Sequence, residues 1–94
     1  MELEVLVPVS PPSVAEHPLA PRLAGLAGRR IGLLSNGKAN ATELLDFVGA
    51  GLSERWPGIE IRREIKPHGP TIGAPRDVMG RLCECDAVVL AIAD

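Results

Sequence analysis

Hydrophobic and polar residues change their spacing repeatedly along the 94-residue chain, and three stretches have the patterns of β-strands. Residues 29–37, RRIGLLSNG, have an apolar body and end at a turn signal, which predicts a buried strand. Residues 59–66, IEIRREIK, alternate between isoleucine and charged positions, which predicts a strand with one wet face at a sheet edge. Residues 87–93, AVVLAIA, are apolar throughout, which is typical of a strand buried on both faces.

A first helix is predicted between the first two strands, over residues 41–56. Its apolar positions recur every three or four residues, at Leu44, Leu45, Val48 and Leu52. Asn40 is a suitable N-cap, and Glu43 follows three residues later, as in a capping box. Pro57-Gly58 then predicts the end of the helix.

A second, shorter helix is predicted over residues 76–85, RDVMGRLCEC, with Val78, Met79 and Leu82 facing inward. The order strand, helix, strand, helix, strand predicts an α/β fold with a parallel sheet, because crossovers of this kind are right-handed. Placing the alternating strand outside gives a small Rossmann-like sheet in the order 2-1-3. This fold is expected to be incomplete at its C-terminus, since the last strand is apolar on both faces but has no outer neighbour.

The chain is predicted to divide into an arm and one folded unit. Residues 1–21 form an N-terminal arm or proline-rich linker, with five prolines between positions 8 and 21. Residues 22–94 form the Rossmann-like half domain, beginning with a short stretch, 22–28, that favours one or two helical turns. Whether residues 3–7, LEVLV, join the sheet is left open by their pattern.

Composition and charge exclude several partners. The formal net charge is −2, and Phe47 and Trp56 are the only aromatic residues, so neither a basic footprint nor a base-stacking surface is expected for nucleic acid. No apolar run approaches the roughly 20 residues that cross a membrane. The N-terminus carries glutamates where a signal peptide has lysine or arginine, which predicts a cytoplasmic protein without a membrane partner.

A binding site is expected where the first and third strands end, because open α/β sheets bind ligands beyond the carboxyl ends of their strands. The loop SNGKAN at residues 35–40 and the end of the last strand should meet there, beside the N-terminus of the first helix. This environment favours an anionic group: a carboxylate, a phosphate, a thiolate or a selenolate. The candidate residues for anion or substrate binding are Asn36, Gly37, Lys38, Asn40 and Asp94.

No cofactor or metal is predicted. The loop lacks the P-loop pattern, and no G-x-G-x-x-G follows any strand. Cys83 and Cys85 are weak redox candidates, because such close neighbours rarely form a disulfide. Two thiols alone do not make a four-ligand zinc site.

The segment from APRLAGLAGRRIGLLSNGKANATELLDFVGAGLSERW to CDAVVLAIAD resembles the small UGSC-type (seleno)proteins over about residues 20–94. In that family a similar C-D-A-V-V segment leads directly into selenocysteine-Gly-Ser-Cys or its Cys-Gly-Ser-Cys equivalent. The matching residues are Pro21, Arg22, Leu26, Gly28, Arg30, Ile31, Gly32, Leu33, Leu34, Asn36, Gly37, Lys38, Asn40 and Ala41, then Cys85, Asp86, Ala87, Val88, Val89 and Asp94.

The resemblance implies thiol or selenol redox or nucleophilic chemistry, with the selenol and the second cysteine of the tetrad as the reactive pair. The tetrad itself is absent, and selenocysteine is encoded by UGA, which is ordinarily read as stop. The chain is therefore expected to be the N-terminal part of a selenoprotein, inactive as it stands, with its catalytic group directly after Asp94 and none within the chain.

Two other functions stay open. The first alternative is a complete, non-enzymatic small subunit whose last strand pairs with a partner chain. The second alternative is a small anion-binding domain that uses the Lys38 loop. A homo-oligomer or a partner chain is expected to cover strand 87–93 both in a truncated selenoprotein and in a small subunit, because an unpaired strand edge can pair with another chain.

Overall fold

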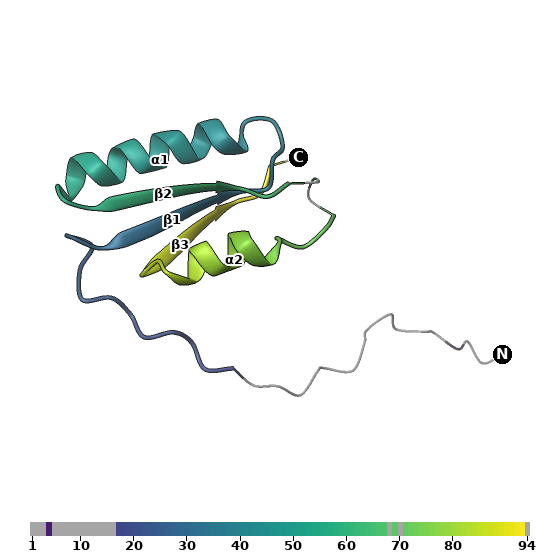
Figure 1. Cartoon of the computed structure of the whole chain (residues 1–94), viewed down its shortest axis with the longest axis horizontal. Coiled ribbons are helices and arrows are strands. Elements are labelled where there is room, and N and C mark those ends of the chain that lie inside the picture. The colour runs from purple at the N-terminus through teal and green to yellow at the C-terminus, as the bar shows by residue number, and fades with distance from the viewer. Residues whose placement is uncertain (1–3, 5–16, 68, 70, 94) are drawn as a thin grey trace.

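The computed structural model describes residues 4, 17–67, 69 and 71–93, which include all of the predicted strands and helices. Three parallel strands, β1 (Arg30–Ser35), β2 (Glu60–Ile65) and β3 (Ala87–Ala91), alternate with two helices, α1 (Ala41–Arg55) and α2 (Arg76–Cys83). The sheet has the order β2-β1-β3, so the predicted α/β fold and 2-1-3 topology are confirmed. Figure 1 shows the sheet between the two helices, one on each face.

The face beneath α1 holds the larger core. Ile31 and Leu33 of β1 are buried there against Ala41 and Leu45 of α1. The helix approaches closely at Gly49, where an added Cβ would lie 3.0 Å from a methyl carbon of Leu33. This contact determines how α1 is rotated about its own axis, and the buried residues of α1 recur at intervals of four.

The predicted inward face of α1 is wrong at one position. Leu44 is 57% exposed, because Ala41, Leu45 and Gly49 define the buried line and Leu44 lies about 100° from Leu45 around the helix. Met79 of α2, 48% exposed, differs from its prediction for the same reason, since Val78 and Leu82 define the buried line of that helix.

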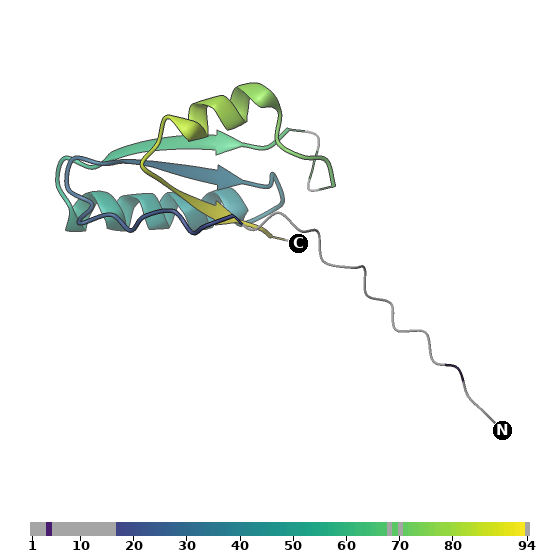
Figure 2. The ribbon, with the colours of Figure 1, turned by 90° about the horizontal axis from the view of Figure 1, so that it is seen from below.

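Helix α2 lies over β1 and leans toward β2. Its buried residues Val78 and Leu82 pack on Leu34 of β1. The fit is close at Gly32, where an added Cβ would lie 2.9 Å from Leu82 Cδ2. Figure 2 shows α2 on the β2 side of the sheet and away from β3.

Two charged pairs hold α2 on that side. Arg81 contacts Glu64 of β2 through Nε and through a second nitrogen at 3.1 Å, while Arg62 of β2 contacts Glu84 at 2.7 Å. The hydrogen bond from Arg81 lowers the pKa of Glu64 below its ordinary value. The charged face of β2, expected to be solvated, is therefore partly covered by the helix.

The last strand is not buried on both faces. Within the described residues β1 is the only strand that pairs with β3, so β3 lies at an edge. Val88, Leu90 and Ile92 are 45%, 56% and 76% exposed on the face that α2 leaves open. The alternate residues, Ala87, Val89 and Ala91, pack toward α1.

The N-terminal part of the chain adds no strand or helix within the described residues. Residues 17–29 contain only a bend and a turn, so the helical turns favoured for residues 22–28 are absent. Residues 3–7 lie mostly outside the described residues, as does most of the predicted arm. No helix in the described part of the chain has the length and apolar character of a membrane span.

Candidate functional site

The carboxyl ends of all three strands meet at one edge of the sheet, as parallel pairing requires. Beyond the ladder, the Asn36 N–H donates to the carbonyl of Ala91, and the Lys66 N–H donates to the carbonyl of Ser35. The chain segments that follow the three strands are thereby tied together. This edge is where the sequence predicted an anion or substrate site.

Asn36 joins the end of β1 to the segment that follows β3 through two hydrogen bonds to Ala93, which we call the Asn36 clamp. Its Nδ2 donates to the carbonyl of Ala93 at 2.9 Å, and its Oδ1 accepts from the Ala93 N–H at 3.3 Å. The same oxygen accepts from the Lys38 N–H at 3.2 Å. Asn36 is 4% exposed, and both the nitrogen and the oxygen of its amide make hydrogen bonds. Its place in the predicted site is therefore that of a positioning residue.

The loop after β1 folds back on itself through Ser35. The Ser35 hydroxyl, on a residue that is 1% exposed, accepts from the Gly37 N–H and from the Thr42 hydroxyl, both at 3.1 Å. Gly37 has φ 83°, a value that favours glycine, and an added Cβ would lie 3.2 Å from the Lys66 carbonyl. Gly37 thus serves the loop's shape. Sequence reasoning did not single out Ser35 or Thr42.

Asn40 does not cap α1 through its side chain. It has φ 73°, in the left-handed region, and makes no side-chain hydrogen bond to the helix, so the predicted capping box does not form. In this conformation its side chain does not reach the first free N–H groups. Asn40 and Lys38 are both exposed beside the Asn36 clamp, while Asp94 lies outside the described residues.

A pocket of about 230 Å³ opens beside the clamp, on the α2 face of the sheet. Its lining is mainly aliphatic: Leu34, Asn36, Lys66, Ala74, Leu90 and Ile92. The signal for its β3 side was present in the sequence, because residues 90 and 92 share one face of the strand. The lean of α2 toward β2, which opens the pocket, has no comparable signal.

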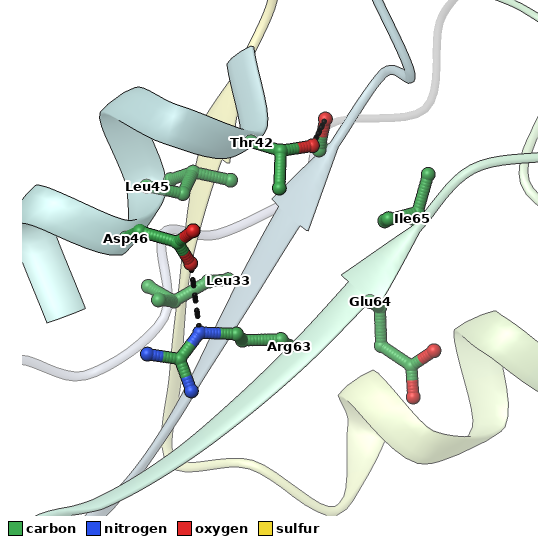
Figure 3. Close-up of a pocket in the computed structure, with 8 residues that line it drawn as sticks. Leu33, Thr42, Leu45, Asp46, Arg63, Glu64 and Ile65 are labelled. Carbon is green, nitrogen blue, oxygen red and sulfur yellow. Dashed lines mark hydrogen bonds and ion pairs between the residues drawn. The ribbon is translucent and has the colours of Figure 1, made fainter. Parts of the chain in front are cut away.

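A smaller pocket of about 70 Å³ lies on the other face, between α1 and β2 (Figure 3). Arg63 Nε donates to Asp46 at 3.0 Å across this space, and Leu33 and Leu45 form its apolar floor. In Figure 3 the carboxylate of Glu64 points away from the pocket toward α2. The side chains that line this pocket do not include a nucleophile paired with a general base.

The two cysteines lie far from the carboxyl edge. Both are free, and they flank the turn that leads from α2 into the amino end of β3. Next to them, Asp86 accepts a hydrogen bond from the Arg30 N–H at 2.8 Å, at the start of β1. Burial raises the pKa of the half-buried Cys85 thiol, whose Sγ contacts the Arg81 carbonyl at 3.7 Å. A raised pKa disfavours the thiolate that redox chemistry needs.

Among the described residues there is no group of three or more His, Cys, Asp or Glu residues arranged to hold a metal ion. The described residues at the carboxyl edge contribute hydrogen bonds and positive charge. Asn36 fixes the backbone at Ala93. Lys38 is exposed in the adjoining loop, which leads to the N-terminus of α1 at Ala41.

Comparison with known proteins agrees with the resemblance in the sequence. Neither a curated protein nor a solved structure gave a significant match to the chain. The UGSC family model matches residues 4–94, which is nearly the whole chain. Because this match covers far more than half of the chain, the chain belongs to the UGSC family.

Proposed function

We propose that the carboxyl edge of the sheet is a thiol- or selenol-dependent site with redox or nucleophilic chemistry. The reactive residues are the tetrad that follows the matching aspartate in the UGSC family, selenocysteine or cysteine and then Gly-Ser-Cys. The observation that carries the proposal is the Asn36 clamp on Ala93, which fixes the backbone next to Asp94. A nucleophile directly after Asp94 would then follow a backbone segment that is fixed by hydrogen bonds, beside the 36–40 loop.

The surroundings of that position favour an ionised nucleophile. Lys38 is exposed in the loop, and α1, with 15 residues, begins at Ala41 with its positive end toward the same edge. A cation and a helix N-terminus both lower the pKa of a thiol, because they stabilise the thiolate. The neighbouring aliphatic pocket, with Leu34 and Leu90 in its walls, supports binding of an apolar substrate group.

In its redox form the reaction transfers two electrons to a disulfide. The selenolate or thiolate attacks one substrate sulfur, a bond to that sulfur forms, and the substrate S–S bond breaks to release a thiolate that takes a proton from water. The cysteine of the tetrad then attacks the first tetrad residue and displaces the second substrate thiol. The tetrad ends as an internal Se–S or S–S bond, which an external dithiol such as dithiothreitol reduces again.

A chain extended by Cys-Gly-Ser-Cys after Asp94 tests this proposal. Its first added thiol should react with iodoacetamide with an apparent pKa below the ordinary value of about 8.5. Replacing Lys38 by Met should raise that pKa, whereas the matched variant Arg55→Met, which removes a positive charge from the far end of α1, should change it less. The extended chain should reduce an aromatic disulfide in the presence of dithiothreitol, and the 94-residue chain should not exceed the rate of dithiothreitol alone.

The result that overturns the proposal is an added thiol that titrates at or above the ordinary value and does not respond to the Lys38 substitution. Equal disulfide reduction by the extended chain and the 94-residue chain would contradict it as well.

A further inference from the structure

No strand pairs with the outer edge of β3 among the described residues, although β3 is the most apolar strand of the sheet. Residues 19–23 line a pocket together with Asp86 and Ala87, at the amino end of β3. Its exposed side chains Val88, Leu90 and Ile92 form a row on one face, which we call the β3 row. A strand edge with free N–H and C=O groups is a template for pairing with another chain. The β3 row would be removed from water by such pairing.

Natural edge strands are protected by charges, prolines or bulges, and β2 shows such protection. Glu60 of β2 contacts Arg30 at 3.1 Å, and Arg62 and Glu64 are engaged by α2. Residues 87–93 contain neither a charged residue nor a proline. Within residues 87–93 the β3 edge therefore has no charge that would repel a strand of the same composition, and the nearest like charges in the pairing proposed below are Asp86 and Asp94 at the two ends of this stretch.

We propose that two copies of this 94-residue chain pair antiparallel along the outer edges of their β3 strands, with Leu90 at the two-fold axis. An isologous interface needs a self-complementary surface. In this register Leu90 lies opposite Leu90 of the second copy, and Val88 lies opposite Ile92. Every pair formed by residues 87–93 is apolar, so no like charges oppose each other within this stretch.

The position of α2 leaves room for the second copy. The ion pairs from Arg81 to Glu64 and from Arg62 to Glu84 hold α2 toward β2. The β3 row is consequently exposed, and Figure 2 shows the ribbon of α2 on the β2 side, away from β3. Pairing would join the three strands of each copy into one continuous sheet, with the β3 rows side by side at its centre. The contact area is small, so we expect a dissociation constant in about the micromolar range.

Sedimentation of the 94-residue chain over a range of concentrations tests the proposal. The wild type should show a monomer–dimer equilibrium, and Leu90→Lys should shift it to monomer by at least about tenfold in the dissociation constant, equivalent to 1.4 kcal/mol. Phe47→Lys is the matched control, because Phe47 is 79% exposed on α1, away from the β3 edge. Circular dichroism should show both variants folded.

A cross-linking experiment keeps the test independent of the lysine variant. In a Cys83→Ser, Cys85→Ser background, Leu90→Cys should form a disulfide-linked dimer on mild oxidation, since residues directly opposite in antiparallel strands have Cβ atoms about 4.5–5.5 Å apart. Phe47→Cys should cross-link far more slowly.

Three outcomes would overturn the proposal. They are a wild type that stays monomeric at about 200 µM, which is well above the expected dissociation range, a dimer that Leu90→Lys leaves unchanged, and equal cross-linking by the two cysteine variants.

Discussion

The two outer strands of the sheet meet their surroundings in different ways. β2 carries alternating charges, and the helix that follows it returns to engage Arg62 and Glu64. β3 carries no charge between residues 87 and 93, and its exposed face holds Val88, Leu90 and Ile92. Where the described chain supplies a covering element, the strand is polar, and where it supplies none, the strand is apolar. The comparison teaches that β3 has the sequence of a strand with a neighbour.

The largest difference between the two sides should appear on removing one leucine from each. Leu82 of α2 is 6% exposed and seats the helix on β1, so Leu82→Ala should cost about 2–5 kcal/mol in the free energy of unfolding. Leu90→Ala on the β3 row should cost less than about 1 kcal/mol in the monomer, because Leu90 is 56% exposed. Urea unfolding, followed by circular dichroism, measures both. Similar losses of unfolding free energy in the two variants would contradict the exposure of Leu90 on the open face of β3.

A smaller effect is expected at the clamp that holds the end of β3. Asn36→Ala should lower the free energy of unfolding by about 1–3 kcal/mol, because it removes the amide that makes three partly buried hydrogen bonds to the backbone of Ala93 and Lys38. Hydrogen exchange at Ala93 should rise in the same variant.

Asn40→Gly is the matched control for the clamp. Asn40 has φ 73° and makes no side-chain cap, so its replacement should change stability by no more than about 0.5 kcal/mol. If Asn40→Gly destabilises the protein as much as Asn36→Ala does, the clamp is not the tie that holds β3.

A still smaller effect on stability should distinguish the β2 edge, which α2 partly covers, from the β3 edge, because it should depend on pH. The pKa of Glu64 is lowered from its ordinary value of 4.5 by Arg81, so the pair stabilises the fold fully above that pH. The stabilisation is lost as the pH falls below 4.5 through the folded-state pKa. Glu64→Gln should therefore be less stable than wild type at pH 7, and the difference should vanish in acid.

The control for this charge is Glu54→Gln, which removes a carboxylate from an exposed position of α1. Its stability relative to wild type should change much less between pH 7 and acid. A Glu64→Gln difference that stays constant through the acid range would show that the ion pair does not act as described.

The smallest expected effect is kinetic and concerns the turn between α2 and β3. Iodoacetamide at pH 8 should modify Cys83 before Cys85, because Cys83 is exposed, whereas Cys85 is half-buried and burial raises its pKa. Peptide mass spectrometry over time distinguishes the two sites. Faster modification of Cys85 would revive it as a reactive thiol.

The sequence predicted the elements well because each has a strong local period. The alternation in IEIRREIK identified the β2 edge, and the apolar runs at 29–37 and 87–93 identified the other two strands. Right-handed crossovers then left one arrangement of the three. The fold was predictable to this extent because periodicity and connection rules are local or nearly local.

The failures have a common physical cause, which is long-range packing. The buried line of α1 is set by the close approach of Gly49 to Leu33, which the spacing of leucines does not encode. The clamp joins residues 57 positions apart, whereas the sequence assigned Asn36 to a turn and to anion or substrate binding and not to a contact with the end of β3. Asn40 matched a capping box by residue type, but its left-handed backbone removed the side chain from the helix end.

We propose, from the membership of the UGSC family and from the hydrogen bonds of Asn36 to Ala93, that the reactive residue lies directly after Asp94. Reading the gene beyond the Asp94 codon tests it most directly. We expect UGA followed by codons for Gly, Ser and Cys, or a cysteine codon in place of UGA. A UAA or UAG codon, or a reading frame that continues without Gly-Ser-Cys, would contradict the claim.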